Sequence, residues 1–193
     1  MNLTRLFPQL MCVLDDVPAC DDFFEKLTQY EYRPTGYYRE GKTLITPNTK
    51  LLDDFVETKN HFIDEFNRVA SFYLGLNTTF RMGTSWGTKT EPFGHGVSHS
   101  HSNYYYSGVY YPKGCSSLTL FAPASNYCFT LHKQTEFNCN QQTFEPKAGQ
   151  AILFPANMPH KIDYNNSEEE RYSVAFNFSP MPPYGLSDAE VFK

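Results

Sequence analysis

Short runs rich in aromatic and β-branched residues fill the sequence from about Phe80 onward, and turn-forming residues separate them. Aromatic and β-branched side chains favour strands, whereas Pro, Gly and Asn interrupt them. The runs cover residues 81–88, 104–111, 117–121, 129–131, 143–146, 150–154, 160–164 and 171–178. Eight short strands at this spacing are typical of a β-sandwich or jelly roll, in which two sheets pack face to face.

The front of the chain favours helices instead. Residues 51–76 carry apolar side chains at intervals of three and four, with charged side chains between them. That period is the pattern of an amphipathic helix packed on a sheet. Residues 17–30 predict a shorter helix, and residues 32–48 are typical of a loop or short strand because Pro and Gly interrupt them.

A chain of 193 residues fits one domain with a sizeable core. We therefore expect a mainly β fold with N-terminal helices. A helical front over residues 1–78 would pack on a jelly-roll core over residues 79–179, and residues 180–193 would form a tail. The five cysteines are odd in number and include no CxxC pair, which predicts reduced thiols rather than a disulfide framework or a zinc site.

The charge of the chain bears on its partners. The formal net charge is −5 and the pI is about 5.6, whereas a general nucleic-acid surface is basic. No apolar run approaches the ~18 residues of a membrane span, and the start of the chain lacks the pattern of a signal peptide. We expect a cytoplasmic protein with neither a membrane nor a nucleic acid as partner.

Three histidines stand out from the strand pattern. His99 and His101 are one residue apart just before the run 104–111, and His160 begins a later run. Side chains two apart in an extended segment project from the same face, and closure of a barrel would bring His160 opposite them. Imidazole suits Fe, Zn, Cu and Ni, and three ligands on one face leave open positions. His95 lies close by, but the flanking glycines disfavour a helical pair with His99, so we expect it at the rim of the site or behind a ligand.

Arg171 opens the last run, whose odd-numbered positions are small or polar and whose even-numbered positions are large and apolar. An arginine on an inward face needs an anionic partner because an unpaired buried charge is costly. A carboxylate of a bound diacid would be such a partner, since arginine offers a bidentate fork and Ser173 can add a hydrogen bond. An ion pair with the glutamates at 168–170 is the alternative interpretation.

These motifs together resemble a known family. Residues 99–103, His-Ser-His-Ser-Asn, precede Ser-Gly-Val-Tyr-Tyr at 107–111. Gly-Gln-Ala-Ile-Leu-Phe-Pro at 149–155 then precedes His160, and Arg-x-Ser leads to Phe-Asn within 171–177. In this order the motifs resemble a group of 2-oxoglutarate/Fe(II)-dependent oxygenases common in bacteria and phages. The resemblance covers residues 86–177, and the helical front matches only in general character.

The resemblance implies a double-stranded β-helix, the cupin-like jelly roll. It implies Fe(II) held by His99, His101 and His160, with the distal carboxylate of 2-oxoglutarate bound by Arg171 and Ser173. Most members of the wider superfamily have Asp or Glu where this chain has His101. A carboxylate elsewhere or a water molecule could supply the second ligand instead, although no Asp or Glu stands beside His99 at a suitable spacing.

The resemblance also implies a reaction: hydroxylation by O2 of a small-molecule or peptidyl substrate, with release of succinate and CO2. Two other functions fit the residues. Three histidines also suit cupin-type dioxygenases that need no 2-oxoglutarate, and an aromatic-rich jelly roll can be a binding module without catalysis. Trp86, Asn103, Tyr105 and Tyr111 are candidates for the wall of the site, although such residues more often serve barrel packing, and they are not counted among the site residues.

Overall fold

The structure is a computed structural model that describes residues 9–34, 41–114, 116–122, 133, 135 and 138–182. Its helices are α1 (Phe23–Gln29) and α2 (Val56–Phe72), with a 3₁₀ turn at Leu51–Asp54. Its strands are β1 (Cys12–Leu14), β2 (Arg33–Pro34), β3 (Thr43–Ile45), β4 (Phe80–Thr90), β5 (Tyr106–Tyr111), β6 (Leu118–Phe121), β7 (Gln141–Phe144), β8 (Gln150–Pro155), β9 (His160–Ile162) and β10 (Arg171–Pro180).

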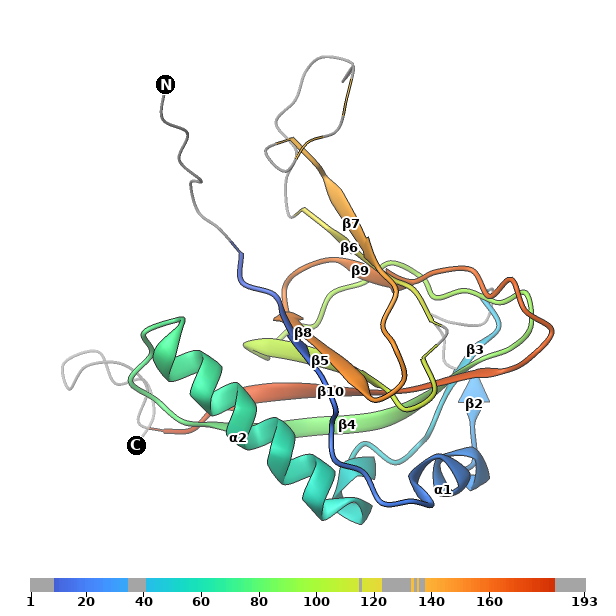
Figure 1. Ribbon diagram of the computed structural model, residues 1–193, viewed down its shortest axis with the longest axis horizontal. Helices are drawn as coiled ribbons and strands as arrows, with labels where there is room; N and C mark the ends of the chain where they lie inside the picture. The colour runs from blue at the N-terminus through green and yellow to red at the C-terminus, as the bar shows by residue number, and fades with distance from the viewer. Residues whose placement is uncertain are drawn as a thin grey trace.

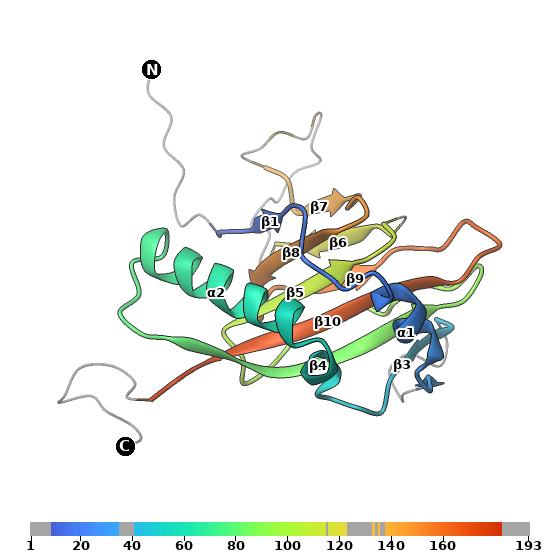
Figure 2. The same ribbon diagram turned by 60° about the horizontal axis from the view of Figure 1, so that its bottom comes forward.

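The strands form two antiparallel sheets. The large sheet has the order β1-β8-β5-β10-β4-β3-β2, and the small one has the order β7-β6-β9. Both helices lie along one face of the large sheet, and the small sheet lies on the other face (Figures 1 and 2). Two facing antiparallel sheets with helices outside one of them are consistent with the predicted jelly roll. No helix in the described part of the chain is long and apolar enough to cross a membrane.

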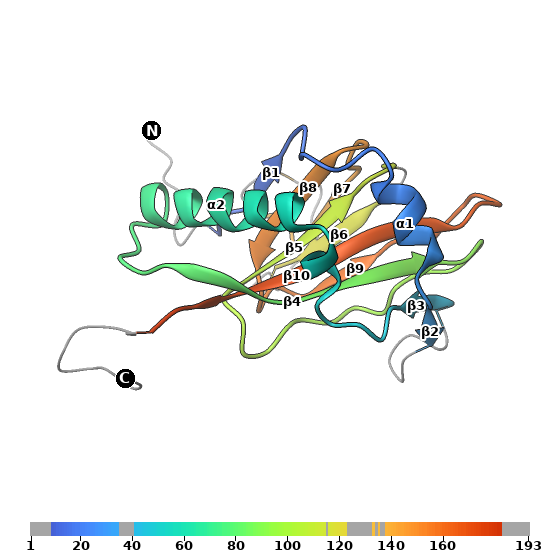
Figure 3. The same cartoon turned by 90° about the horizontal axis from the view of Figure 1, so that it is seen from below.

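The outer core lies between α2 and the large sheet. Helix α2 runs across this sheet, over β10 and β4 (Figure 3). Phe62 of α2 stacks on Phe176 with ring centroids 4.4 Å apart, and Phe66 stacks on Phe178 at the same separation. All four rings are fully buried. The three- and four-residue spacing of apolar side chains therefore serves to cover the sheet, as the sequence predicted.

A second, smaller core lies between the two sheets. It consists of Val109, Tyr111, Leu118, Leu120, Ile152, Phe154 and Met158.

Gly108 lies in β5 where a Cβ atom would approach the ring of Phe176 to 2.3 Å. A side chain there would displace that ring, so the glycine permits the close contact between β5 and β10.

The front of the chain is less helical than predicted. Residues 17–22 stay outside α1, and Phe55 (φ −130°, ψ 64°) separates the 3₁₀ turn from α2. Three short strands of this region, β1, β2 and β3, extend the edges of the large sheet. Strands of two or three residues are too short to show alternation in a sequence. The strand predicted at 129–131 lies outside the described residues.

Candidate metal centre

The three predicted histidines come together at the edge of the small sheet. The His99 segment pairs with the start of β9: the His99 N–H donates to the His160 carbonyl at 3.0 Å, and the His160 N–H donates to the His99 carbonyl at 2.8 Å. The His101 N–H donates to the Ala156 carbonyl at 2.8 Å. These backbone bonds position His99 and His101 without a regular strand at that point.

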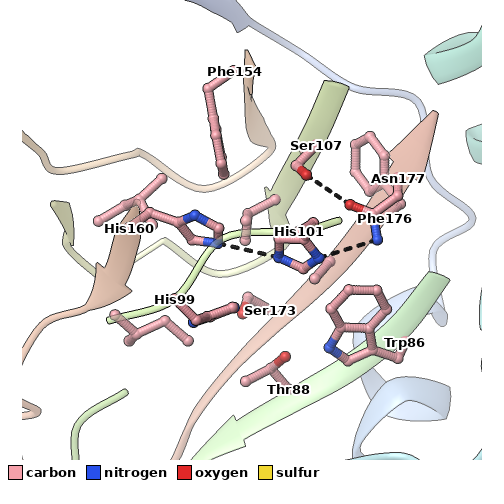
Figure 4. Close-up of a pocket in the computed structure, with 15 residues that line it drawn as sticks. Trp86, Thr88, His99, His101, Ser107, Phe154, His160, Ser173, Phe176 and Asn177 are labelled. Carbon is pink, nitrogen blue, oxygen red and sulfur yellow. Dashed lines mark hydrogen bonds between the residues drawn. The ribbon is translucent and has the colours of Figure 1, made fainter. Parts of the chain in front are cut away.

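The three imidazoles converge on one point (Figure 4). One ring nitrogen from each lies within 4.8 Å of the others, and the two Nε2 atoms of His101 and His160 are 3.3 Å apart. Metal–nitrogen bonds of about 2 Å place neighbouring ligand atoms roughly 3 Å apart. The spacing therefore fits one metal ion. Within the described part of the chain, the group consists of these histidines and contains no carboxylate.

Two of the rings have their tautomer set by the backbone. Nδ1 of His99 lies 2.9 Å from the carbonyl oxygen of Val97, and Nδ1 of His160 lies 2.9 Å from that of Met158. A carbonyl only accepts, so each Nδ1 carries a hydrogen, and in the neutral ring Nε2 then has the lone pair. A backbone acceptor behind a histidine is the usual arrangement for a metal ligand.

Burial keeps two of the three rings, His101 and His160, uncharged. Desolvation, assisted by the nearby His99, lowers the pKa of His101 to about 4 and that of His160 to about 3. The side chain of Phe154 contributes to this by packing edge-on against His160, with centroids 4.7 Å apart. Both imidazoles are therefore neutral at pH 7, which is the form that binds metals.

A cavity of about 30 Å³, room for roughly two water molecules, lies between the histidines and the large sheet. Ser173 lines this cavity. Arg171 lies two residues along the same face of β10 but lines a second cavity of about 530 Å³, and its Nη2 donates to the Asp163 carbonyl at 2.6 Å. The structure thus joins Ser173 directly to the histidines and places Arg171 further along β10. Of the glutamates at 168–170, Glu170 pairs with Lys89, whose Nζ lies 2.8 Å from its Oε1.

Tyr111 lies on the inward face of β5, and the burial of its hydroxyl bears on ligand binding. The residue is 1% exposed, and the hydroxyl has no hydrogen-bond partner among the described residues. Burial raises the pKa of Tyr111, and the charge of Arg171 acts in the opposite direction. A buried hydroxyl near a guanidinium is an unused donor that an anion could satisfy.

Trp86 and Asn177 also contact the centre. The indole of Trp86 stacks on His101 with centroids 5.6 Å apart. Asn177, which the sequence analysis did not single out, places its side-chain amide 3.3 Å from Nδ1 of His101. Its signals in the sequence are its position on the same polar face as Arg171 and Ser173 and its place in the Phe-Asn element of the family motif.

Other candidates lie away from the cavity. Tyr105 is 41% exposed and stacks on Phe80, and Asn103 is an exposed residue with φ of 68°. His95 is exposed, and its Nδ1 lies 3.2 Å from the Gly96 carbonyl. None of these three residues lines the cavity beside the histidines.

Residues 84–177 match the model of a family described as "Putative 2OG-Fe(II) oxygenase". This range contains the three histidines, Arg171 and Ser173. No curated protein sequence is significantly similar to the chain.

Several solved structures have the same fold. A prolyl-4-hydroxylase from Pseudomonas putida matches with a TM-score of 0.59 at 15% identity, over 88% of this chain and 92% of that one. An oxidoreductase of the 2OG-Fe(II) oxygenase family from Burkholderia pseudomallei matches with a TM-score of 0.58 at 13% identity, over 88% and 85%. HygX from Streptomyces hygroscopicus, solved with nickel and 2-oxoglutarate bound, matches with a TM-score of 0.56 at 12% identity, over 89% and 83%. At these identities the likeness establishes the double-stranded β-helix.

Proposed function

From the match of residues 84–177 to the 2OG-Fe(II) oxygenase family model and from the shared fold, we propose that this chain belongs to that family and is a 2-oxoglutarate- and Fe(II)-dependent dioxygenase. The reaction would hydroxylate a small-molecule or peptidyl substrate with O2 and release succinate and CO2. The observation that carries the proposal is the convergence of three imidazoles on one point inside this fold.

His99, His101 and His160 would hold the iron. Their spacing, the lowered pKa values of His101 and His160, and the backbone acceptors behind His99 and His160 support this role. Iron bound there would supply the oxygen activation that couples decarboxylation of 2-oxoglutarate to oxidation of the substrate. The protein contributes the ligand geometry and the dry cavity beside it.

Arg171, Ser173 and Tyr111 would bind the distal carboxylate of 2-oxoglutarate. Arg171 and Ser173 share one face of β10, and the Tyr111 hydroxyl lies near the guanidinium. A carboxylate would give this hydroxyl the acceptor that it lacks, which removes a penalty of about 1–3 kcal/mol for an unpaired buried donor.

The charge of the centre supports a dianionic co-substrate. Three imidazoles add no charge to a divalent ion, whereas the usual carboxylate ligand would remove one unit. A co-substrate with two carboxylates would place one negative charge beside the ion and the other beside Arg171. His99 and His101 are half-exposed whereas His160 is buried, so the substrate would approach from the side of the first two.

Succinate production from 2-oxoglutarate in the presence of Fe(II) tests the proposal. His160→Ala should abolish turnover and metal binding, whereas His61→Ala, a change on α2 far from the centre, should leave both intact. If oxygen is consumed equally without 2-oxoglutarate, the chain is a three-histidine dioxygenase of another type. If the wild-type chain binds no metal, the catalytic proposal fails and a binding module becomes the better interpretation.

A further inference from the structure

The three histidines differ in what lies behind the ring. His99 and His160 each direct Nδ1 at the backbone carbonyl two residues earlier. His101 does not follow this arrangement: the carbonyl two residues before it belongs to His99 and accepts the His160 N–H. Nδ1 of His101 faces a side chain instead, the amide of Asn177 at 3.3 Å.

Asn177 connects three neighbouring strands. It lies directly opposite Ser107 of β5 and Thr84 of β4, and it is 1% exposed. The Ser107 hydroxyl donates to its Oδ1 at 2.6 Å, and its Nδ2 donates to the Thr84 hydroxyl at 3.0 Å. The amide therefore sits in a rigid frame with His101 as its third neighbour (Figure 4).

The Ser107 and Thr84 hydroxyls allow either orientation of the Asn177 amide. A hydroxyl can donate or accept, so Ser107 and Thr84 satisfy the amide oxygen and nitrogen in both positions. A half-turn about the Cβ–Cγ bond exchanges two groups of nearly the same size. The neighbour that distinguishes the two orientations is His101, because its Nδ1 is either a donor or an acceptor.

In the observed orientation the hydrogen bonds form one continuous chain. Nδ2 of Asn177 donates to Nδ1 of His101, so the hydrogen of this neutral ring is on Nε2. That hydrogen points at Nε2 of His160, 3.3 Å away, and His160 in turn donates from Nδ1 to Met158. Each amide and ring N–H in this chain of hydrogen bonds has an acceptor, but Nε2 of His101 has no lone pair for a metal.

We propose that Asn177 is a positioning residue that sets the tautomer of His101 and turns its amide when the centre takes up a metal. With Oδ1 towards the ring, Nδ1–H of His101 donates to the amide, and Nε2 presents its lone pair beside those of His99 and His160. Asn177 then supplies from a side chain the acceptor that the other two histidines receive from the backbone. This inference rests on the metal site of the proposed function and not on 2-oxoglutarate.

The tautomer of His101 can be measured by ¹⁵N NMR of the imidazole nitrogens. We expect the metal-free wild type to carry the hydrogen on Nε2, and addition of Zn(II) to move it to Nδ1. Asn177→Asp replaces the amide with a group that only accepts, so its His101 should carry the hydrogen on Nδ1 even without metal. A wild-type His101 that carries its hydrogen on Nδ1 both without and with Zn(II) overturns the proposal.

Zn(II) affinity provides the second measurement. Asn177→Ala should weaken Zn(II) binding about 10- to 100-fold, as loss of a hydrogen-bond partner behind a ligand does. Asn177→Asp should bind Zn(II) at least as tightly as wild type. Asn67→Ala is the matched control, since Asn67 also makes three side-chain hydrogen bonds, to Ile63 and Phe80, but lies far from the centre. Its Zn(II) affinity should stay within about twofold of wild type.

The two proposals fail in different ways. If the wild type binds Zn(II) and a folded Asn177→Ala variant binds it equally tightly, Asn177 does not position His101. If Asn177→Ala does not fold, Asn177→Asp decides the matter, because Zn(II) binding weaker than that of wild type contradicts the proposal. If the wild type binds no metal at all, the proposed function is wrong, and the same titration reveals it.

Discussion

Strand β10 presents two unlike faces to its surroundings. The outer face carries Val174, Phe176 and Phe178, which pack beneath the helices and are fully buried. The inner face carries Arg171, Ser173, Ala175 and Asn177, which face the histidines and the small sheet. Neighbouring residues on one strand therefore have different physical surroundings.

The contrast separates stability from chemistry. The outer face contributes to the free energy of folding through apolar burial and close packing. Removal of a buried aromatic ring from this face is therefore costly. The inner face gains little from burial, and its polar groups require specific partners. Substitutions on the outer face should therefore change unfolding, whereas substitutions on the inner face should change binding.

The largest effect is expected on the outer face. Phe178→Ala removes a ring that is 0% exposed and stacked on Phe66, so it should lower the free energy of unfolding by about 3–5 kcal/mol. Urea unfolding measures this change. Phe72→Ala, at a residue 78% exposed, should change it by less than about 0.5 kcal/mol. An unchanged unfolding transition in Phe178→Ala, with weaker Zn(II) binding, would reverse the roles of the two faces.

The next largest effect is expected at the far end of the inner face. Arg171→Met removes charge-assisted hydrogen bonds worth about 1.5–3 kcal/mol, so 2-oxoglutarate should bind about 10- to 100-fold more weakly to the Zn(II)-loaded protein. Calorimetry measures this, and the Zn(II) affinity itself should not change. Arg81→Met, at an exposed residue of β4, is the control. An equal loss of Zn(II) affinity in Arg171→Met would make this arginine a structural residue.

The two faces were also predictable to different degrees. Alternation along 171–178 predicted both faces of β10, because a regular strand repeats every two residues. The sequence also predicted that three histidines would meet. That prediction relied on His99 and His101 projecting from the same face of an extended segment, and the structure holds them in another way. They lie outside a regular strand, and backbone bonds to His160 and Ala156 hold them in place.

Other features required the register of several strands. Asn177 has its function only because Ser107 and Thr84 stand opposite it and His101 approaches from a loop. That arrangement depends on pairing between segments about 70 to 90 residues apart, which a single sequence does not encode locally. Strand β1 was missed, and β2 and β3 were predicted only as a loop or short strand, for the simpler reason that two or three residues show no alternation.

Tyr111→Phe should produce two effects of opposite sign. Without co-substrate the Tyr111 hydroxyl is buried and unpaired among the described residues, so its removal should raise the free energy of unfolding by about 1 kcal/mol. The same change should weaken 2-oxoglutarate binding about 5- to 10-fold. Tyr106→Phe is the contrast, because the Tyr106 hydroxyl donates to the Leu10 carbonyl at 2.9 Å, and its loss should destabilise the protein. If Tyr111→Phe destabilises the protein as well, the hydroxyl already has a partner.

The smallest energetic effect is expected at Trp86, the single tryptophan of the chain, which makes it an intrinsic reporter of the inner face. Its ring stacks on His101, so Zn(II) binding should change its fluorescence with a stoichiometry of one, and His160→Ala should abolish that change. Trp86→Phe keeps an aromatic ring, and since such contacts are worth about 0.5–1.5 kcal/mol, replacing one ring by another should alter Zn(II) affinity by no more than about twofold.

The same fluorescence reports on the co-substrate. A five-carbon diacid is larger than a cavity of about 30 Å³, so side chains on its wall must move when 2-oxoglutarate enters. Trp86 is the largest of these side chains, and a second fluorescence change on addition of 2-oxoglutarate is therefore expected. Emission that responds to Zn(II) but not to saturating 2-oxoglutarate would mean that the co-substrate enters by the Arg171 side, through the second cavity.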